Sequence, residues 1–208
     1  GTMKAPVAGQ VAQIAPDMRR LVAPNPSPMT YRGTNTYLIG KTDVAVIDPG
    51  PDSDAHLDAI LQNCSDNQRI THILVTHSHV DHSPLSKRLS EKTGAPILAF
   101  GPSSAGRSDA MNACLAAGMS GGGEGIDHTF RPDLIVCDGD KIDAGDTAVT
   151  AIHTPGHMGN HLSFVWEDAV FCGDHVMDWA TSLVSPPDGD LTDFMTSCEK
   201  LDARQWRV

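Results

Sequence analysis

The stretch Thr-His-Ser-His-Val-Asp-His at residues 76–82 decides how this sequence is interpreted. It follows the apolar, β-branched run Ile73–Val75, which predicts a buried strand that ends in a turn. Side chains around such a strand end can point into one cleft, and imidazole and carboxylate groups suit zinc or, less strictly, iron or manganese. The alternative is a histidine-rich surface loop, although clustered imidazoles repel one another when protonated. The stretch therefore predicts a metal site whose candidate ligands are His77, His79, Asp81 and His82.

Two later segments carry candidate ligands at further strand ends. The segment Thr-Pro-Gly-His at 154–157 follows a predicted strand, and its Pro-Gly pair forces a tight turn before His157. Asp174 follows another apolar strand after Gly173. On its own Asp174 would be interpreted as a turn or cap residue. Loops at strand ends can gather ligands that are distant in sequence, so both residues become candidates for the same site.

Composition places the chain among ordinary globular proteins and restricts its partners. It has 208 residues, of which 40% are hydrophobic and 20% charged, and its formal net charge is −11. No basic stripe is visible, so a nucleic-acid partner is not indicated, although it is not excluded. No stretch approaches the roughly 18 apolar residues that a transmembrane helix needs. We therefore expect a small-molecule substrate and no membrane association, and the oligomeric state is left open.

The cysteines predict a reducing compartment. Five are present, scattered and without a Cys-x-x-Cys pair, which argues against a disulfide framework. No apolar segment of a signal peptide is visible at the N-terminus. We therefore expect a cytoplasmic protein.

Hydrophobic periodicity predicts strands in runs with helices between them, which is typical of sheets covered by helices. The expected strands are a weak one in 6–14, then 36–39, 44–47, 70–76, 96–100, 134–137, 141–142, 148–153, 162–166 and 169–172. The expected helices are 53–63, 83–93, 110–117 and 191–201, the last capped by Asp190. Two segments stay undecided: the glycine run 121–125 is either a mobile loop over the cleft or a connector, and 182–190 is either a stiff cleft wall or a connection.

The order and spacing of these motifs resemble the metallo-β-lactamase superfamily. Two upstream segments, Gly-Thr-Asn-Thr-Tyr-Leu at 33–38 and Val-Ile-Asp-Pro-Gly at 46–50, fit the same pattern, so the resemblance covers most of the chain. It implies an α+β protein with an αβ/βα four-layer sandwich and two metals between the sheet edges. In these proteins a further His normally binds the second metal after the residue that matches Asp174. No His occurs among 183–208, so we expect residues 3–208 to be a single domain whose C-terminal part is missing beyond Val208.

The resemblance also implies a role for each candidate residue. His77, His79 and His157 would hold the first metal, Asp81 and His82 the second, and Asp174 both. Asp48 is expected beside the ligands and not among them. His161 fits a Thr-Pro-Gly-His-x-x-x-His pattern shared with endoribonuclease relatives, and is expected to orient a ligand or contact substrate. The expected cofactor is zinc, two ions in a full-length chain, with iron or manganese as alternatives.

This ligand set implies hydrolysis. Two divalent ions lower the pKa of a shared water, and the resulting metal-bridging hydroxide attacks a carbonyl or phosphorus centre. Asp174 and Asp81 are the candidate catalytic residues. The expected substrate is a thioester, an ester or a related small molecule, as in glyoxalase-II-like members. Alternatives are an endoribonuclease-like phosphodiester hydrolase, a mononuclear-iron enzyme like persulfide dioxygenase, and an inactive metal-binding remnant.

Overall fold

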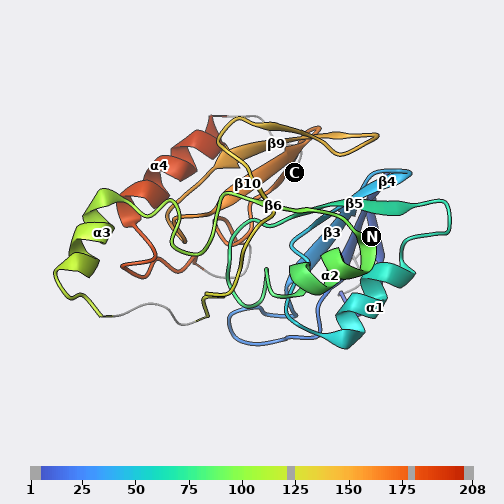
Figure 1. The fold of residues 1–208 in the computed structure, drawn as a ribbon, viewed down its shortest axis with the longest axis horizontal. Coiled ribbons are helices and arrows are strands. Elements are labelled where there is room, and N and C mark those ends of the chain that lie inside the picture. The colour runs from blue at the N-terminus through green and yellow to red at the C-terminus, as the bar shows by residue number, and fades with distance from the viewer. Residues whose placement is uncertain (1–5, 121–124, 178–180, 204–208) are drawn as a thin grey trace.

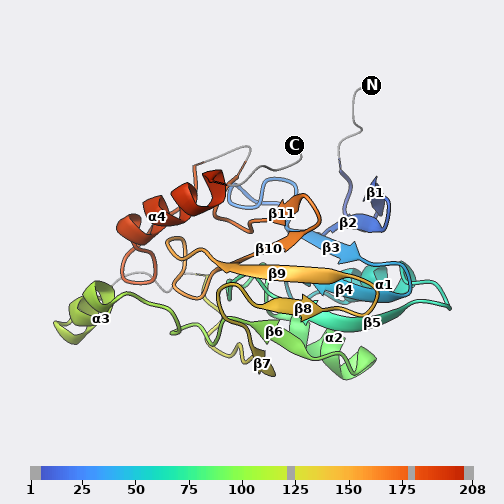
Figure 2. The ribbon, with the colours of Figure 1, turned by 90° about the horizontal axis from the view of Figure 1, so that it is seen from above.

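Two β-sheets face each other in this protein, and helices lie outside them (Figures 1 and 2). The structure is a computed structural model that describes residues 6–120, 125–177 and 181–203. The first sheet has seven strands and the second has four. Residues 121–124 of the glycine run lie outside the described residues, so neither interpretation of that run is tested.

The first sheet combines antiparallel and parallel pairing. The strands β1 (Ala12–Ala15), β2 (Met18–Val22), β3 (Asn35–Ile39) and β4 (Asp43–Ile47) pair antiparallel in chain order. The strands β5 (Arg69–Leu74), β6 (Ile97–Ala99) and β7 (Leu134–Ile135) then add in parallel. Parallel neighbours need a crossover connection, which α1 (Asp54–Gln62) and α2 (Leu85–Thr93) supply after β4 and β5.

Alternation along β4 shows how this sheet separates two cores. Val44 and Val46 pack with Leu57 and Ile60 of α1, on the helix side of the sheet. Ala45 and Ile47 belong to the other core, which lies between the two sheets. A strand with apolar residues on both faces is buried on both, and this explains the continuous run Val44–Ile47.

The second sheet is antiparallel throughout, in the order β11-β10-β9-β8. Its strands are β8 (Lys141–Asp143), β9 (Ala148–His153), β10 (Leu162–Trp166) and β11 (Ala169–Phe171). The helices α3 (Asp109–Ala116) and α4 (Leu191–Asp202) lie at the opposite end of the molecule from α1 (Figures 1 and 2). None of the helices in the described ranges is long and apolar enough to cross a membrane.

Most of the predicted elements are confirmed, with shifts at their ends. Asp190 caps α4 as expected, because its Oδ1 accepts hydrogen bonds from the backbone N–H groups of Thr192 and Asp193. β2 was not predicted, since Arg19 and Arg20 interrupt the apolar pattern of 18–22. Tertiary pairing with β3 overrides that weak local signal.

Candidate metal centre

The ends of three strands bring all six predicted ligands together. The 76–82 stretch follows β5, His157 follows β9, and Asp174 follows β11. In the described part of the chain, two groups of side chains have potential ligand atoms within 4.8 Å of one another. The first group is His77, His79, His157 and Asp174, and the second is Asp81, His82 and Asp174.

The first group is built around His79. Its Nδ1 lies 3.0 Å from His77 Nε2 and 3.0 Å from His157 Nε2. Asp174 Oδ2 lies 3.9 Å from the same atom of His77 and 3.7 Å from that of His157. Three imidazole nitrogens and a carboxylate oxygen therefore converge on one point, and this donor set is typical of zinc.

Neighbouring groups determine which ring nitrogen of His77 and of His157 carries no hydrogen. Thr76 Oγ1 donates its only hydrogen to Asp48 Oδ2 at 2.7 Å, so it must accept a hydrogen bond from Nδ1–H of His77 at 2.9 Å. His157 Nδ1 donates to the Leu183 carbonyl at 2.7 Å. The Nε2 atoms of both rings consequently carry lone pairs that face the centre.

The lone pairs of His77 and His157 both face His79 Nδ1, and they repel one another unless a cation or a His79 N–H lies between them. Burial, joined by the neighbouring imidazoles, lowers the pKa of His77 well below its usual value. Burial likewise lowers the pKa of His79 to about 4. Because the charged imidazolium forms are disfavoured there, a metal ion is the cation that this donor set fits.

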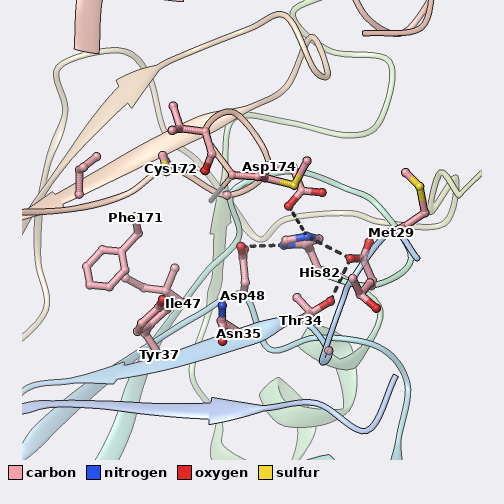
Figure 3. Close-up of a pocket in the computed structure, with 17 residues that line it drawn as sticks. Met29, Thr34, Asn35, Tyr37, Ile47, Asp48, His82, Phe171, Cys172 and Asp174 are labelled. Carbon is pink, nitrogen blue, oxygen red and sulfur yellow. Dashed lines mark hydrogen bonds and ion pairs between the residues drawn. The ribbon is translucent and has the colours of Figure 1, made fainter. Parts of the chain in front are cut away.

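The second group surrounds one imidazole with carboxylates (Figure 3). His82 Nδ1 donates to Asp48 Oδ2 at 2.9 Å, while its Nε2 lies 3.2 Å from Asp81 Oδ2 and 3.2 Å from Asp174 Oδ1. Burial lowers the pKa of His82, but the three carboxylates outweigh burial and raise it well above its usual value. The negative charge of the three carboxylates favours a cation, and a divalent ion can take the place of the proton on His82 Nε2.

Asp174 belongs to both groups. Its Oδ2 faces His77 and His157, whereas its Oδ1 faces His82. Burial raises the pKa of Asp174, but His82, through its charge and its hydrogen bond, together with His157 keeps that pKa below its usual value. The carboxylate is therefore ionised and presents one oxygen to each group.

Asp48 joins the two groups from behind, and it is a ligand candidate in neither. Its Oδ1 accepts a hydrogen bond from the backbone N–H of Thr76 at 2.7 Å. Its Oδ2 accepts from both Thr76 Oγ1 and His82 Nδ1. One buried carboxylate thus orients His77, through Thr76, and His82 directly.

The segment 33–38 contributes a hydrogen bond to the second group. Thr34 Oγ1 donates to Asp81 Oδ2 at 2.9 Å, and Asn25 Nδ2 donates to Thr34 Oγ1 at 3.1 Å. Gly33 precedes this threonine with a φ of 124°, and a Cβ there would lie 2.1 Å from the Ala23 carbonyl oxygen. The segment therefore needs glycine at this position.

His161 lies behind the first group and belongs to neither set of ligand candidates. It is fully buried, its ring centroid is 5.0 Å from that of His77, and its Nδ1 lies 2.9 Å from Thr154 Oγ1. Its Nε2 has no hydrogen-bond partner among the described residues. The structure therefore places His161 against a ligand ring, away from the converging donor atoms.

Several contacts around the centre were not predicted from the sequence. Asn160 Nδ2 donates to Ser78 Oγ at 2.9 Å, and the backbone N–H of Asp127 donates to the Ser78 carbonyl at 2.8 Å. These bonds fix the loop between His77 and His79 from its outer side. Asn160 and Ser78 are 82 residues apart, and neither residue type signals such a partner.

His153, His175 and Cys172 belong to neither group of ligand candidates. His153 is packed on Phe100, with ring centroids 3.9 Å apart. His175 is buried beside Cys198, with its Nε2 3.5 Å from the Sγ atom. Cys172 lines a cavity of about 220 Å³ next to Asp81, His82 and Asp174 (Figure 3).

The undecided segment 182–190 connects to the last helix, and none of its residues lines the cavity beside Asp81, His82 and Asp174. Its Leu183 carbonyl contacts His157, and its Asp190 caps α4. The segment therefore also contacts one of the predicted metal ligands directly.

Known proteins place the chain in a family. The profile of the Metallo-beta-lactamase superfamily matches residues 29–204. The chain belongs to this superfamily. It is 31% identical over 207 residues to "Atrochrysone carboxyl ACP thioesterase AgnL7" of Paecilomyces divaricatus. The aligned region covers 98% of this chain and 57% of that protein. The chain spans about half the length of the curated relatives it matches.

Solved structures of the superfamily confirm the fold. A beta-lactamase domain protein from Burkholderia ambifaria superposes with a TM-score of 0.71 at 21% identity, covering 97% of this chain and 69% of that chain. TTHA1623 in a di-iron-bound form superposes with a TM-score of 0.61 at 24% identity, covering 86% of this chain and 84% of that chain. The expected metallo-β-lactamase fold, two sheets with flanking helices, is therefore correct.

Gly173 gives a first prediction for this superfamily member. It has a φ of +48°, and a Cβ there would lie 2.7 Å from His161 Nε2 and 2.8 Å from Thr76 Oγ1. We expect Gly173→Ala to displace the adjacent Asp174, weaken metal binding and lower the free energy of unfolding by about 1–3 kcal/mol beyond the backbone cost. Denaturant unfolding and metal titration measure both effects.

Gly139→Ala is the matched control for this variant. Gly139 has a φ of +85°, and nothing lies within 4 Å of a Cβ built there. Both alanines carry the left-handed backbone cost of about 1–2 kcal/mol, and only the one at 173 meets other side chains. Equal loss of stability in the two variants, with unchanged metal binding, would contradict the prediction.

Proposed function

We propose that this protein is a metal-dependent hydrolase of thioesters, and of related esters, with two zinc ions at its centre. The observation that carries the proposal is Asp174, whose two oxygens face two different sets of donor atoms. A shared carboxylate of this kind suits two ions held side by side. The thioesterase name of AgnL7 supports the substrate class. Iron stays an alternative metal, since TTHA1623 has a di-iron form, and manganese suits the same donors.

Each residue has a role in this proposal. His77, His79 and His157 would hold the first ion, Asp81 and His82 the second, and Asp174 both. The ions, when bound, would lower the pKa of a water molecule and stabilise negative charge on the substrate carbonyl oxygen. Asp81 and Asp174 would orient the attacking water by accepting its hydrogen. Thr34 fixes the Asp81 carboxylate, and Asp48 keeps His77 and His82 in the tautomers that expose Nε2.

A thioester suits a site of this composition. A thiol has a pKa of about 8.5, so the thiolate departs from a tetrahedral intermediate without strong acid assistance. With metal bound, the ligand candidates would be carboxylates and imidazoles without a proton on the atoms that face the centre, and such groups do not supply an acid. An amide or an unactivated ester would need a proton on its leaving group.

The proposal predicts thiol release that depends on metal. We expect the zinc-loaded protein to hydrolyse an acyl-N-acetylcysteamine thioester faster than the matched oxyester, measured by a thiol-reactive dye. A chelator should abolish the reaction, and added zinc should restore it. Oxygen uptake with a persulfide, measured on iron-loaded protein, is the control for oxidative chemistry. Thiol release that survives complete metal removal, or oxygen uptake without hydrolysis, would overturn the proposal.

A further inference from the structure

The carbonyl of Leu183 selects the ligand atom of His157. The Nδ1–H of His157 donates to it at 2.7 Å, which leaves Nε2 as the atom that faces His79 and Asp174. Leu183 is 26 residues from His157 in the sequence, in the segment that precedes α4. The position of this carbonyl therefore depends on how the segment is held.

The segment 183–190 folds back on the turn that carries His157. The backbone N–H of Gly189 donates to the Ser185 carbonyl at 2.8 Å, and that of Asp190 donates to the Gly156 carbonyl at 2.9 Å. A Cβ on Gly189 would lie 2.7 Å from Ser185 N and 2.9 Å from Gly156 O. Both ends of the segment thus contact the 154–157 turn, and a shift at 188–190 would move the Leu183 end.

A second segment, 106–108, anchors that part of the chain. Arg107 Nη2 lies 2.8 Å from Asp188 Oδ1, and the two side chains are only 17% and 13% exposed. Ser108 Oγ donates to Asp190 Oδ2 at 2.6 Å. The anchor also lies against the chain just after the 154–157 turn, because a Cβ on Gly106 would lie 2.0 Å from the Gly159 carbonyl oxygen. Breaking a largely buried ion pair leaves the other charge uncompensated, so this contact constrains the segment more than an exposed pair would.

We propose that Arg107 and Asp188 are positioning residues for the first metal. Their ion pair holds 183–190 in the shape that presents the Leu183 carbonyl to His157. Without it the carbonyl shifts, His157 loses the partner that sets its tautomer, and the metal binds more weakly. The inference rests on the metal centre of the proposed function and is independent of the substrate.

Zinc affinity tests the proposal directly. We expect Arg107→Met and Asp188→Asn each to weaken zinc binding at the first metal site, that of His77, His79 and His157, by about 10- to 100-fold. Loss of partners behind a metal ligand has effects of this size. Competition with a chromophoric chelator measures the dissociation constant. The absorption spectrum of the cobalt-substituted protein reports whether the ligand geometry has changed. Arg107→Lys keeps a cation for the single contact with Asp188 and should recover most of the affinity.

Arg88→Met is the matched control. Arg88 of α2 pairs with Asp52 and Asp54, whose side chains are 60% and 86% exposed, and its loss should leave zinc affinity unchanged. Asp188→Asn is nearly isosteric, so it decides the outcome even if Arg107→Met does not fold. A folded Asp188→Asn protein with wild-type zinc affinity and an unchanged cobalt spectrum would overturn the inference. Weakened zinc affinity supports the positioning role even if no thioester is hydrolysed. A failure of the proposed function can therefore be distinguished from a failure of this inference.

Discussion

Replacing Asp174 with Ala should remove most of the hydrolytic activity and weaken both metals at once. No other described residue belongs to both ligand groups. A catalytic metal supplies several kcal/mol of transition-state stabilisation, and a loss of about 3 kcal/mol corresponds to about a 100-fold fall in rate. We therefore expect kcat/KM for the thioester to fall by at least about 100-fold. Elemental analysis should also find fewer ions per chain.

The controls for this variant separate chemistry from folding. Asp58 is an exposed carboxylate on α1, far in the sequence from the strand ends that form the centre, and Asp58→Ala should behave like the wild type. Removing Asp174 relieves repulsion from Asp81 but loses the stronger attraction to His82, so the metal-free variant should be somewhat less stable than the metal-free wild type, and activity is compared on folded protein. Full activity with undiminished metal content in Asp174→Ala would exclude the proposed centre.

The ligand candidates could be found from the sequence because only a few residue types, here His and Asp, have side chains that bind such metals. The 76–82 stretch concentrates imidazoles and a carboxylate at a strand end, and His157 and Asp174 occupy equivalent positions after β9 and β11. Alternation and apolar runs likewise predicted most of the strands that form the two cores, with β2 as the exception. These signals are local, so a single sequence is enough to detect them.

The partners behind the ligands could not be found in that way. Every residue has a backbone carbonyl, so nothing in the sequence marks Leu183 as the acceptor for His157. Thr76 and Asn160 are similarly common types whose partners, Asp48 and Ser78, are distant in the chain. The orientation of the ligands is therefore a property of the tertiary structure.

Asp48→Asn should test how much the orientation of the ligands contributes to metal binding. The substitution changes none of the ligand candidates and almost no side-chain volume. Asp48 accepts hydrogen bonds at both oxygens, from Thr76 and from His82. An asparagine can accept at its oxygen only, and its amide nitrogen is a donor. If the asparagine oxygen accepts from the backbone N–H of Thr76, its NH₂ group faces the Nδ1–H of His82, and two donors then point at each other. If the side chain is flipped, the NH₂ group faces the backbone N–H of Thr76 instead.

His82 can escape this opposition by moving its proton to Nε2, the atom that faces Asp81 and Asp174. Thr76 Oγ1, no longer able to donate to position 48, can turn its hydrogen to His77 Nδ1 and so place the proton of that ring on Nε2 as well. Both metal positions would then face an N–H group in place of a lone pair. We expect zinc affinity to fall by about 10- to 100-fold at each position.

Zinc titration and nitrogen NMR of the imidazole tautomers measure these two effects together. Asp146→Asn is the matched control, since Asp146 also accepts from backbone N–H groups, those of Lys41 and Thr42, but at an exposed turn. That variant should keep wild-type affinity. If Asp48→Asn binds zinc normally with unchanged tautomers, the rings must be oriented by their other contacts, and Asp48 would be needed only for the turn after β4.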